Sequence, residues 1–188
     1  MSFHPHSAPT VPTPRNTSRQ PASTAAATRT YTQRIHASPE RVFPLLCPVR
    51  EAEWLDGWTY ELLRSASGYA EEGCVFRTTL PGEPETIWIV TRHEPGAGRV
   101  DFARVTAGRV ATRLTVRVQA AGEGQSSVDI TYELTPTSPE GERIVTGRHA
   151  EEAFHKSMAW WERSMNHFLA TGTILRETAA GRNAQDHS

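Results

Sequence analysis

The chain has 188 residues, of which 37% are hydrophobic, and its 20 basic and 21 acidic residues leave a formal net charge of −1. This length suits one domain of ordinary size. The balanced charge argues against a nucleic-acid-binding protein, and no apolar stretch reaches the roughly 20 residues that an integral membrane helix needs.

The two ends of the chain differ in composition from its middle. Residues 1–27 are rich in Pro, Ser, Thr and Ala and contain no acidic residue. Such a segment cannot bury enough apolar surface to offset the entropy lost on ordering, so we predict that it is disordered. Residues 177–188 are also polar and are predicted to form a frayed tail. The folded domain is therefore expected to cover residues 28–176.

The folded part begins with one strand and two short helices. Polar and apolar residues alternate over residues 29–36, which is the pattern of a strand. Ser38 followed by Pro39 is typical of a helix start, and Pro48 ends that helix. The residues from Val49 to Gly57 are predicted to form one or two further helical turns closed by the glycine.

Six hairpin-connected strands are predicted next. They are rich in Val, Ile, Thr and aromatic residues, and Gly or Pro lies in the gaps between them. They cover residues 58–65, 73–80, 85–93, 99–106, 110–119 and 126–136. Short gaps make neighbouring strands antiparallel. In the fifth of these strands Val116 shares a face with other apolar residues, while Arg113 and Arg117 lie opposite, so we expect a sheet buried on one face.

A long C-terminal helix is predicted from Ser138 to about Ala170. Large apolar residues recur there at spacings of three and four: Phe154, Met158, Trp161, Met165 and Phe168. Gly141 and Gly147 weaken the first half, so the firm part is expected over residues 149–170. This helix is the candidate to pack against the apolar face of the sheet. We therefore predict an α+β fold, in which a curved antiparallel sheet of about seven strands grips the helix.

Four stretches carry a resemblance to known proteins: IHASPERVFPLLCPVREAEWLDGW, GCVFRTT, ETIWIV and AWWERSMNHFLATG. In this order they resemble the START-like, helix-grip superfamily, also called SRPBCC, over about residues 28–172. This superfamily includes polyketide cyclase/dehydratase-like proteins, and the chain is most similar to bacterial members of unknown function. The resemblance implies a cavity between sheet and long helix that can hold an apolar or amphipathic molecule. It implies no catalytic residues, because the superfamily shares no single set.

Seven residues are predicted to contact such a ligand. The apolar wall would come from Trp54, Trp58, Trp88, Phe154, Met158 and Trp161, and the polar anchor would be Arg50. Each has a structural alternative. The first two tryptophans would equally seal the short helices onto the sheet, the residues on the last helix would equally form core, and Arg50 would equally pair with Glu51 or Glu53.

Two strand arginines have orientations that the pattern leaves open. The segment RVDFARV mixes its two faces, so Arg104 is not assigned to either face, and Arg77 is equally open. An arginine that points inward would be a buried cation. It would need an acidic partner or an anionic ligand, because an unpaired buried charge is costly.

Metal and redox sites have weak support. Glu152 and His155 form an E-x-x-H quartet, but a di-iron site needs a second quartet, so we expect no metal. Cys47 and Cys74 are far apart in sequence and form no CxxC motif, which favours a reduced, cytoplasmic setting. No motif for a cofactor is found, and we expect none.

Three functions remain open. The first is binding of a small hydrophobic or amphipathic molecule by a monomer or homodimer, without nucleic-acid or integral-membrane partners. The second is a cyclase/dehydratase-like enzyme with Glu51, Glu53, His155 or an inward arginine as acid–base groups. The third is a stress-related or partner-binding module whose interior is filled.

Overall fold

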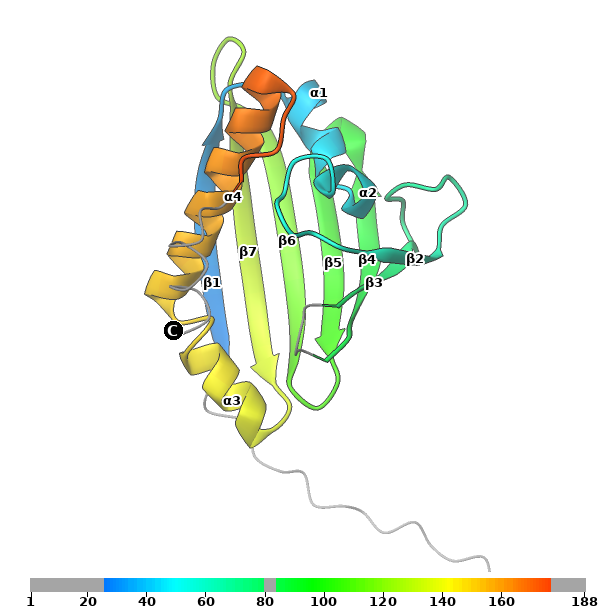
Figure 1. Cartoon of the computed structure of the whole chain (residues 1–188), viewed down its shortest axis with the longest axis vertical. Coiled ribbons are helices and arrows are strands. Elements are labelled where there is room, and N and C mark those ends of the chain that lie inside the picture. Colours follow the sequence, from blue (N-terminus) through cyan, green and yellow to red (C-terminus); the bar gives the residue numbers. More distant parts are fainter. Residues whose placement is uncertain (1–25, 80–83, 177–188) are drawn as a thin grey trace, which may run out of the picture.

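Seven strands form one antiparallel sheet in the computed structural model, which describes residues 26–79 and 84–176 (Figure 1). The strands are β1 (Ala27–Ile35), β2 (Glu61–Arg64), β3 (Val75–Thr78), β4 (Thr86–Glu94), β5 (Arg99–Thr106), β6 (Val110–Ala120) and β7 (Ser126–Pro136). Their spatial order is β1-β7-β6-β5-β4-β3-β2. Apart from Ala26 and Ala27, the predicted disordered segment lies outside the described residues, as does the predicted frayed tail at 177–188.

Short helical segments follow β1, and two helices follow β7. The helical segments are α1 (Pro39–Val42), η1 (Phe43–Leu45), α2 (Pro48–Glu51), η2 (Pro95–Ala97), α3 (Pro139–Thr146) and α4 (Glu151–Thr171). In Figure 1, α4 runs along one face of the sheet beside β1. The short helices α1 and α2 lie near one end of β5 and β6. The predicted α+β helix-grip architecture is confirmed. No helix in the described part of the chain is long and apolar enough to cross a membrane.

The expected single helix from Ser138 is in fact two helices. The chain leaves the helical path at Gly147, and α4 begins after Ala150. Ser138 caps α3 by accepting a hydrogen bond from the Gly141 amide at 3.1 Å. Gly141 has a packing role, because an added Cβ would collide with the carbonyl oxygen of Arg109. It therefore allows α3 to dock closely on the β5–β6 turn.

The inner face of the sheet carries the core. Alternate residues of β6 and β7 are buried, as predicted, and Leu114 pairs across the ladder with Tyr132. The alternation breaks down in β5, where three successive residues, Val100, Asp101 and Phe102, are all buried. The opposing strand β4 shifts register there, between Val90 and Arg92. This irregularity explains why alternation did not predict the faces of β5.

The register settles the two open arginines. Arg104 pairs with the inward Trp88 and lies two residues from the inward Phe102, so it belongs to the inner face. Arg77 alternates with the inward Phe76 and lies on the outer face. There Arg77 forms ion pairs with Glu61 and Glu85 at 2.6 and 2.7 Å.

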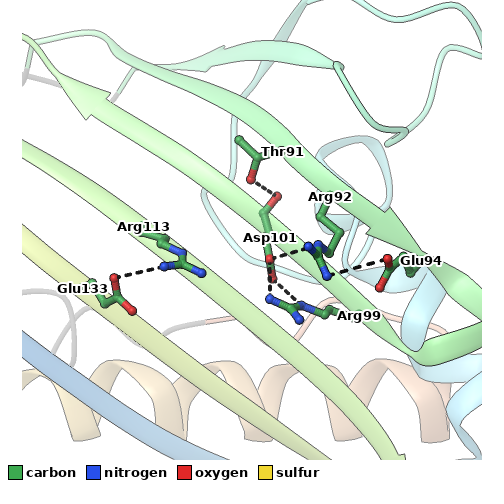
Figure 2. A network of polar contacts seen from close by, with 7 residues as sticks. All are labelled: Thr91, Arg92, Glu94, Arg99, Asp101, Arg113 and Glu133. Atoms are coloured by element: carbon green, nitrogen blue, oxygen red, sulfur yellow. Dashed lines mark hydrogen bonds and ion pairs between the residues drawn. The ribbon is translucent and has the colours of Figure 1, made fainter.

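The outer face, turned away from α4, carries a network of charged side chains (Figure 2). Asp101 is its centre: Arg99 donates to its two carboxylate oxygens at 3.0 and 2.7 Å, and Arg92 lies at 3.6 Å. On the neighbouring strands Arg113 lies 3.6 Å from Glu133. Each arginine drawn in Figure 2 therefore has a carboxylate within ion-pair distance.

Candidate ligand-binding site

A cluster of aromatic rings on β3, β4 and β5 occupies the middle of the inner face. Trp88 is at its centre, stacked on Phe76 with ring centroids 5.4 Å apart, and it meets Phe102 edge to face at 6.1 Å. Trp58, from the loop after α2, closes the cluster at 6.2 Å from Trp88. Aromatic pairs at such distances contribute about 0.5–1.5 kcal/mol each beyond the area they bury. The cluster is therefore a rigid wall as well as an apolar one.

A small cavity lies against this wall. Its lining comes from the short helices, the sheet and α4: Leu46, Pro48, Glu51, Trp58, Phe76, Trp88, Phe102, Leu114, Val116 and Trp161. The volume of about 20 Å³ is enough for about one water molecule. Glu51 is the single charged residue in a lining that is otherwise apolar or aromatic.

Glu51 owes its position to the one-turn helix α2. Pro48 starts this helix and Glu51 ends it, so the two side chains lie three residues apart on the same face and both line the cavity. The residue is 8% exposed, and none of the described residues is found to form a hydrogen bond with its carboxyl group, whose oxygens keep a little accessible surface. Burial raises the pKa of Glu51 to about 8. At neutral pH the group is therefore mainly protonated and presents an O–H donor to the cavity.

The neighbouring charged residues turn the other way. Arg50 Nε lies 2.7 Å from Glu53 Oε1, close enough for an ion pair but not aligned as a hydrogen bond, and both side chains are partly exposed. Arg50 does not line the cavity. The sequence stretch that suggested a polar anchor thus separates into an outer pair and the inner Glu51. The role of Arg50 as a ligand anchor remains a prediction.

The two tryptophans of this stretch also differ. Trp54 is fully buried, donates its indole N–H to the carbonyl oxygen of Leu45 at 3.1 Å, and does not line the cavity. Trp58 is half-buried, donates to the carbonyl oxygen of Pro48 at 2.9 Å, and lines the cavity. Trp54 is thus placed as a structural corner and Trp58 as part of the wall.

The predicted residues on α4 divide in the same way. Trp161 lines the cavity, together with Trp88 from the sheet. Phe154 and Met158 are buried outside it: the first packs edge to face on Tyr132 at 5.3 Å, and the backbone of the second accepts a hydrogen bond from Gln33. As ligand contacts, all four remain predictions.

A second polar group on the inner face is Arg104, whose orientation the sequence left open. Arg104 lies with its guanidinium carbon 5.0 Å from the centroid of Trp88, and its charge opposes the burial that raises the pKa of the Tyr132 hydroxyl. The ring of His149, just before α4, lies 6.4 Å from that of Tyr132. Burial, followed by the charges of Arg104, Arg148 and Arg29, lowers the pKa of His149 to about 4, so this imidazole is neutral at pH 7. Only the inward register of β5 reveals this cluster.

The remaining sequence candidates have local partners. Cys47 and Cys74 are buried free thiols, and the first accepts a hydrogen bond from the amide of Ala70. His155 packs its ring against Tyr31 at 5.5 Å. Over residues 26–79 and 84–176, no group of three or more His, Cys, Asp or Glu side chains is placed to hold a metal ion.

Comparison with known proteins supports the fold. No family model and no curated protein matches the sequence. Norcoclaurine synthase from Thalictrum flavum, solved with dopamine and hydroxybenzaldehyde, superimposes with a TM-score of 0.57 and 15% identity, covering 85% of this chain and 97% of that one. Protein MLL2253 from Mesorhizobium loti gives a TM-score of 0.57 and 14% identity, with 77% and 97% covered.

A further structural match is DynU16, from the dynemicin biosynthetic locus, with a TM-score of 0.55 and 14% identity. The match covers 78% of this chain and 48% of that one, so this chain spans about half the length of DynU16. Such low identities establish the fold alone. The comparisons therefore show that the chain has the helix-grip fold that the resemblance implied.

Proposed function

We propose that the protein binds a small hydrophobic or amphipathic molecule in the cavity between the sheet and α4. The observation that carries this proposal is the buried carboxyl of Glu51, which faces an aromatic-lined cavity without a hydrogen-bond partner among the described residues. A buried polar group without a partner costs about 1–3 kcal/mol. A ligand with one acceptor oxygen would remove this cost and would be oriented by it.

Binding requires the cavity to widen. Pockets for small molecules usually enclose about 300–1,000 Å³, whereas this one holds about one water. Trp58 and Trp161 are the half-buried members of the lining, and Trp58 lies in the loop between α2 and β2. We expect these two side chains to move aside, because the fully buried rings of β3 to β5 are held in the sheet. Apolar area removed from water would then drive binding at about 25 cal/mol per Å².

A small aromatic molecule is the natural first probe. Norcoclaurine synthase, which shares the fold, has been solved with dopamine and hydroxybenzaldehyde. This supports the class of molecule and not its identity. The lining of this chain, with three tryptophans and two phenylalanines, favours a flat apolar body for the same reason.

The test is an NMR titration of the full chain with 1-naphthamide, a neutral aromatic amide. We expect saturable shifts of the indole N–H signals of Trp58, Trp88 and Trp161. Trp160 is the internal control, because it lies on the same helix but does not line the cavity. The absence of saturable shifts, or shifts confined to Trp160, would contradict the proposal and favour the alternative of a filled interior.

An enzyme using the same cavity is a second candidate, and the pKa of Glu51 favours it. A group that titrates at about 8 inside an apolar site is suited to proton transfer near neutral pH. Dehydration of an aromatic β-hydroxyketone, followed by the absorbance of its conjugated product, would test this. The Glu51→Gln variant should abolish any such activity, and equal rates in both proteins would argue against this role.

A further inference from the structure

Arg104 is a cation placed on the apolar face of the sheet. It stands opposite Trp88 in the β4–β5 ladder and opposite Thr112 in the β5–β6 ladder, and both of these residues are buried. The residue is partly exposed, and its partial burial lowers the pKa of its guanidinium. The guanidinium therefore faces the interior that the proposed ligand would enter.

The charge of Arg104 has no acidic counterpart. Its described polar partners are the Trp88 ring and the Tyr132 hydroxyl, and no carboxylate of the described residues forms an ion pair with it. Glu51 does not supply the missing charge at neutral pH, because burial keeps its carboxyl mainly protonated. The exposed Arg148 and the half-buried Arg29 join Arg104 in lowering the pKa of His149.

Placing the Arg104 guanidinium on the apolar face without an acidic partner costs free energy. A buried cation requires a counter-charge, and a guanidinium presents five N–H donors in a fork that matches a carboxylate. The Tyr132 hydroxyl lies within the influence of this charge, and it can donate its own proton to an anion. The two groups together form a cradle for one carboxylate.

Trp88 connects this cradle to the cavity. Its ring lines the cavity and also lies 5.0 Å from the guanidinium carbon of Arg104. We propose that Arg104 and Tyr132 bind the carboxylate of an amphipathic ligand whose apolar body lies against Trp88. This inference rests on the proposed function and specifies its ligand class as an aromatic or other apolar monocarboxylate.

The test compares two ligands of the same shape, 1-naphthoate and 1-naphthamide, by calorimetric titration of the full chain. Hydrogen bonds to charged groups contribute about 1.5–3 kcal/mol, so the carboxylate should bind about 10- to 100-fold more tightly than the amide. Arg104→Gln should remove this preference, because the carboxylate would lose its charged partner and bind no more tightly than the amide. Arg104→Lys should retain only part of it, because a point charge replaces the fork.

The control variant is Arg113→Gln, which removes a sheet arginine from the outer face. It should leave the preference intact, and thermal unfolding of each variant confirms that it is folded. Equal affinities of both ligands for the wild-type protein, or a preference that survives Arg104→Gln, would overturn the inference while the proposed function stands. If neither ligand binds, the proposed function fails, and the inference fails with it.

An NMR titration of His149 gives an independent readout. The positive charge of Arg104 contributes to the low pKa of this imidazole, so an anion bound to Arg104 should raise it. We expect 1-naphthoate to raise the pKa and 1-naphthamide to leave it in place. If the pKa of His149 is the same with either ligand bound, the carboxylate does not lie at Arg104, and the inference is contradicted.

Discussion

The two faces of the sheet treat charge in opposite ways. On the outer face, Asp101 and its arginines satisfy one another within the fold (Figure 2). On the inner face, Glu51 has no hydrogen-bond partner and Arg104 has no carboxylate among the described residues. The charged groups of the outer network thus have their partners within the fold. Glu51 and Arg104 lack such partners among the described residues, and this is the main reason to regard the interior as a binding site and the outer network as structural.

The largest expected effect comes from breaking the inner wall. Trp88→Ala removes the ring that holds Phe76, Phe102 and Trp58 together, and it should lower the free energy of unfolding by about 3–5 kcal/mol. Urea unfolding measures this. Ile89→Ala is the matched control, because the neighbouring side chain points outward and is 40% exposed. A change of similar size in both variants would show that the two faces do not differ in packing.

The next effect concerns the pH dependence that Glu51 imposes. Its ordinary pKa is 4.5 and burial raises it to about 8, so between these values the folded state holds a proton that the unfolded state has released. Stability should therefore fall as pH rises, by up to about 1.4 kcal/mol per pH unit between pH 6.5 and 8. Below pH 6.5 the lowered pKa of His149 contributes a slope of the opposite sign, because the unfolded state binds a proton that the folded state does not. Glu51→Gln should remove this slope and make the protein more stable than the wild type at pH 8.

Urea unfolding at several pH values measures the slope. Glu53→Gln is the control, because this glutamate lies in the partly exposed pair with Arg50 and should leave the slope as it is in the wild type. A wild-type protein whose stability is flat from pH 6.5 to 8, or a slope in this range that survives Glu51→Gln, would contradict the burial of an unpaired carboxyl.

A smaller effect is expected on the outer face. Asp101 is buried, which by itself would raise its pKa, but the bonds from Arg99 outweigh this and hold the pKa below its ordinary 3.8. Asp101→Asn should cost about 1–3 kcal/mol at pH 7. Because the folded pKa is lowered, the wild type loses this advantage as the pH falls below about 3.8.

The exposed Arg113–Glu133 pair should have the smallest effect. Its atoms are 3.6 Å apart and both side chains are more than half exposed, so Glu133→Gln should change stability by less than about 1 kcal/mol. Equal losses for Glu133→Gln and Asp101→Asn in urea unfolding would mean that the outer network is not organised around Asp101.

The sheet and its inner face could be predicted from alternation, and the site only in part. Val116 and Val128 lie on strands whose apolar residues recur every second position, so their faces follow from the sequence. In β5 three successive residues are buried because the partner strand shifts register, and this shift has no signature in RVDFARV. The inward direction of Arg104 could therefore not be predicted.

The same limit applies to the short helix α2. Arg50 and Glu51 are neighbours on a single turn, and about 100° separates their directions around the helix axis. Which of them points inward depends on how this turn docks onto the sheet. That docking is a tertiary property, so the pattern identified the right stretch and favoured Arg50, whereas the structure places Glu51 in the cavity wall.

The most direct test of the account is a crystal structure of the protein grown with 1-naphthoate. We expect the naphthalene ring to lie between Trp58, Trp88 and Trp161, with its carboxylate within hydrogen-bond distance of Arg104 and Tyr132. An interior still filled by these side chains at saturating ligand, or the ligand bound on the outer face, would contradict the claim that the inner face is the binding site.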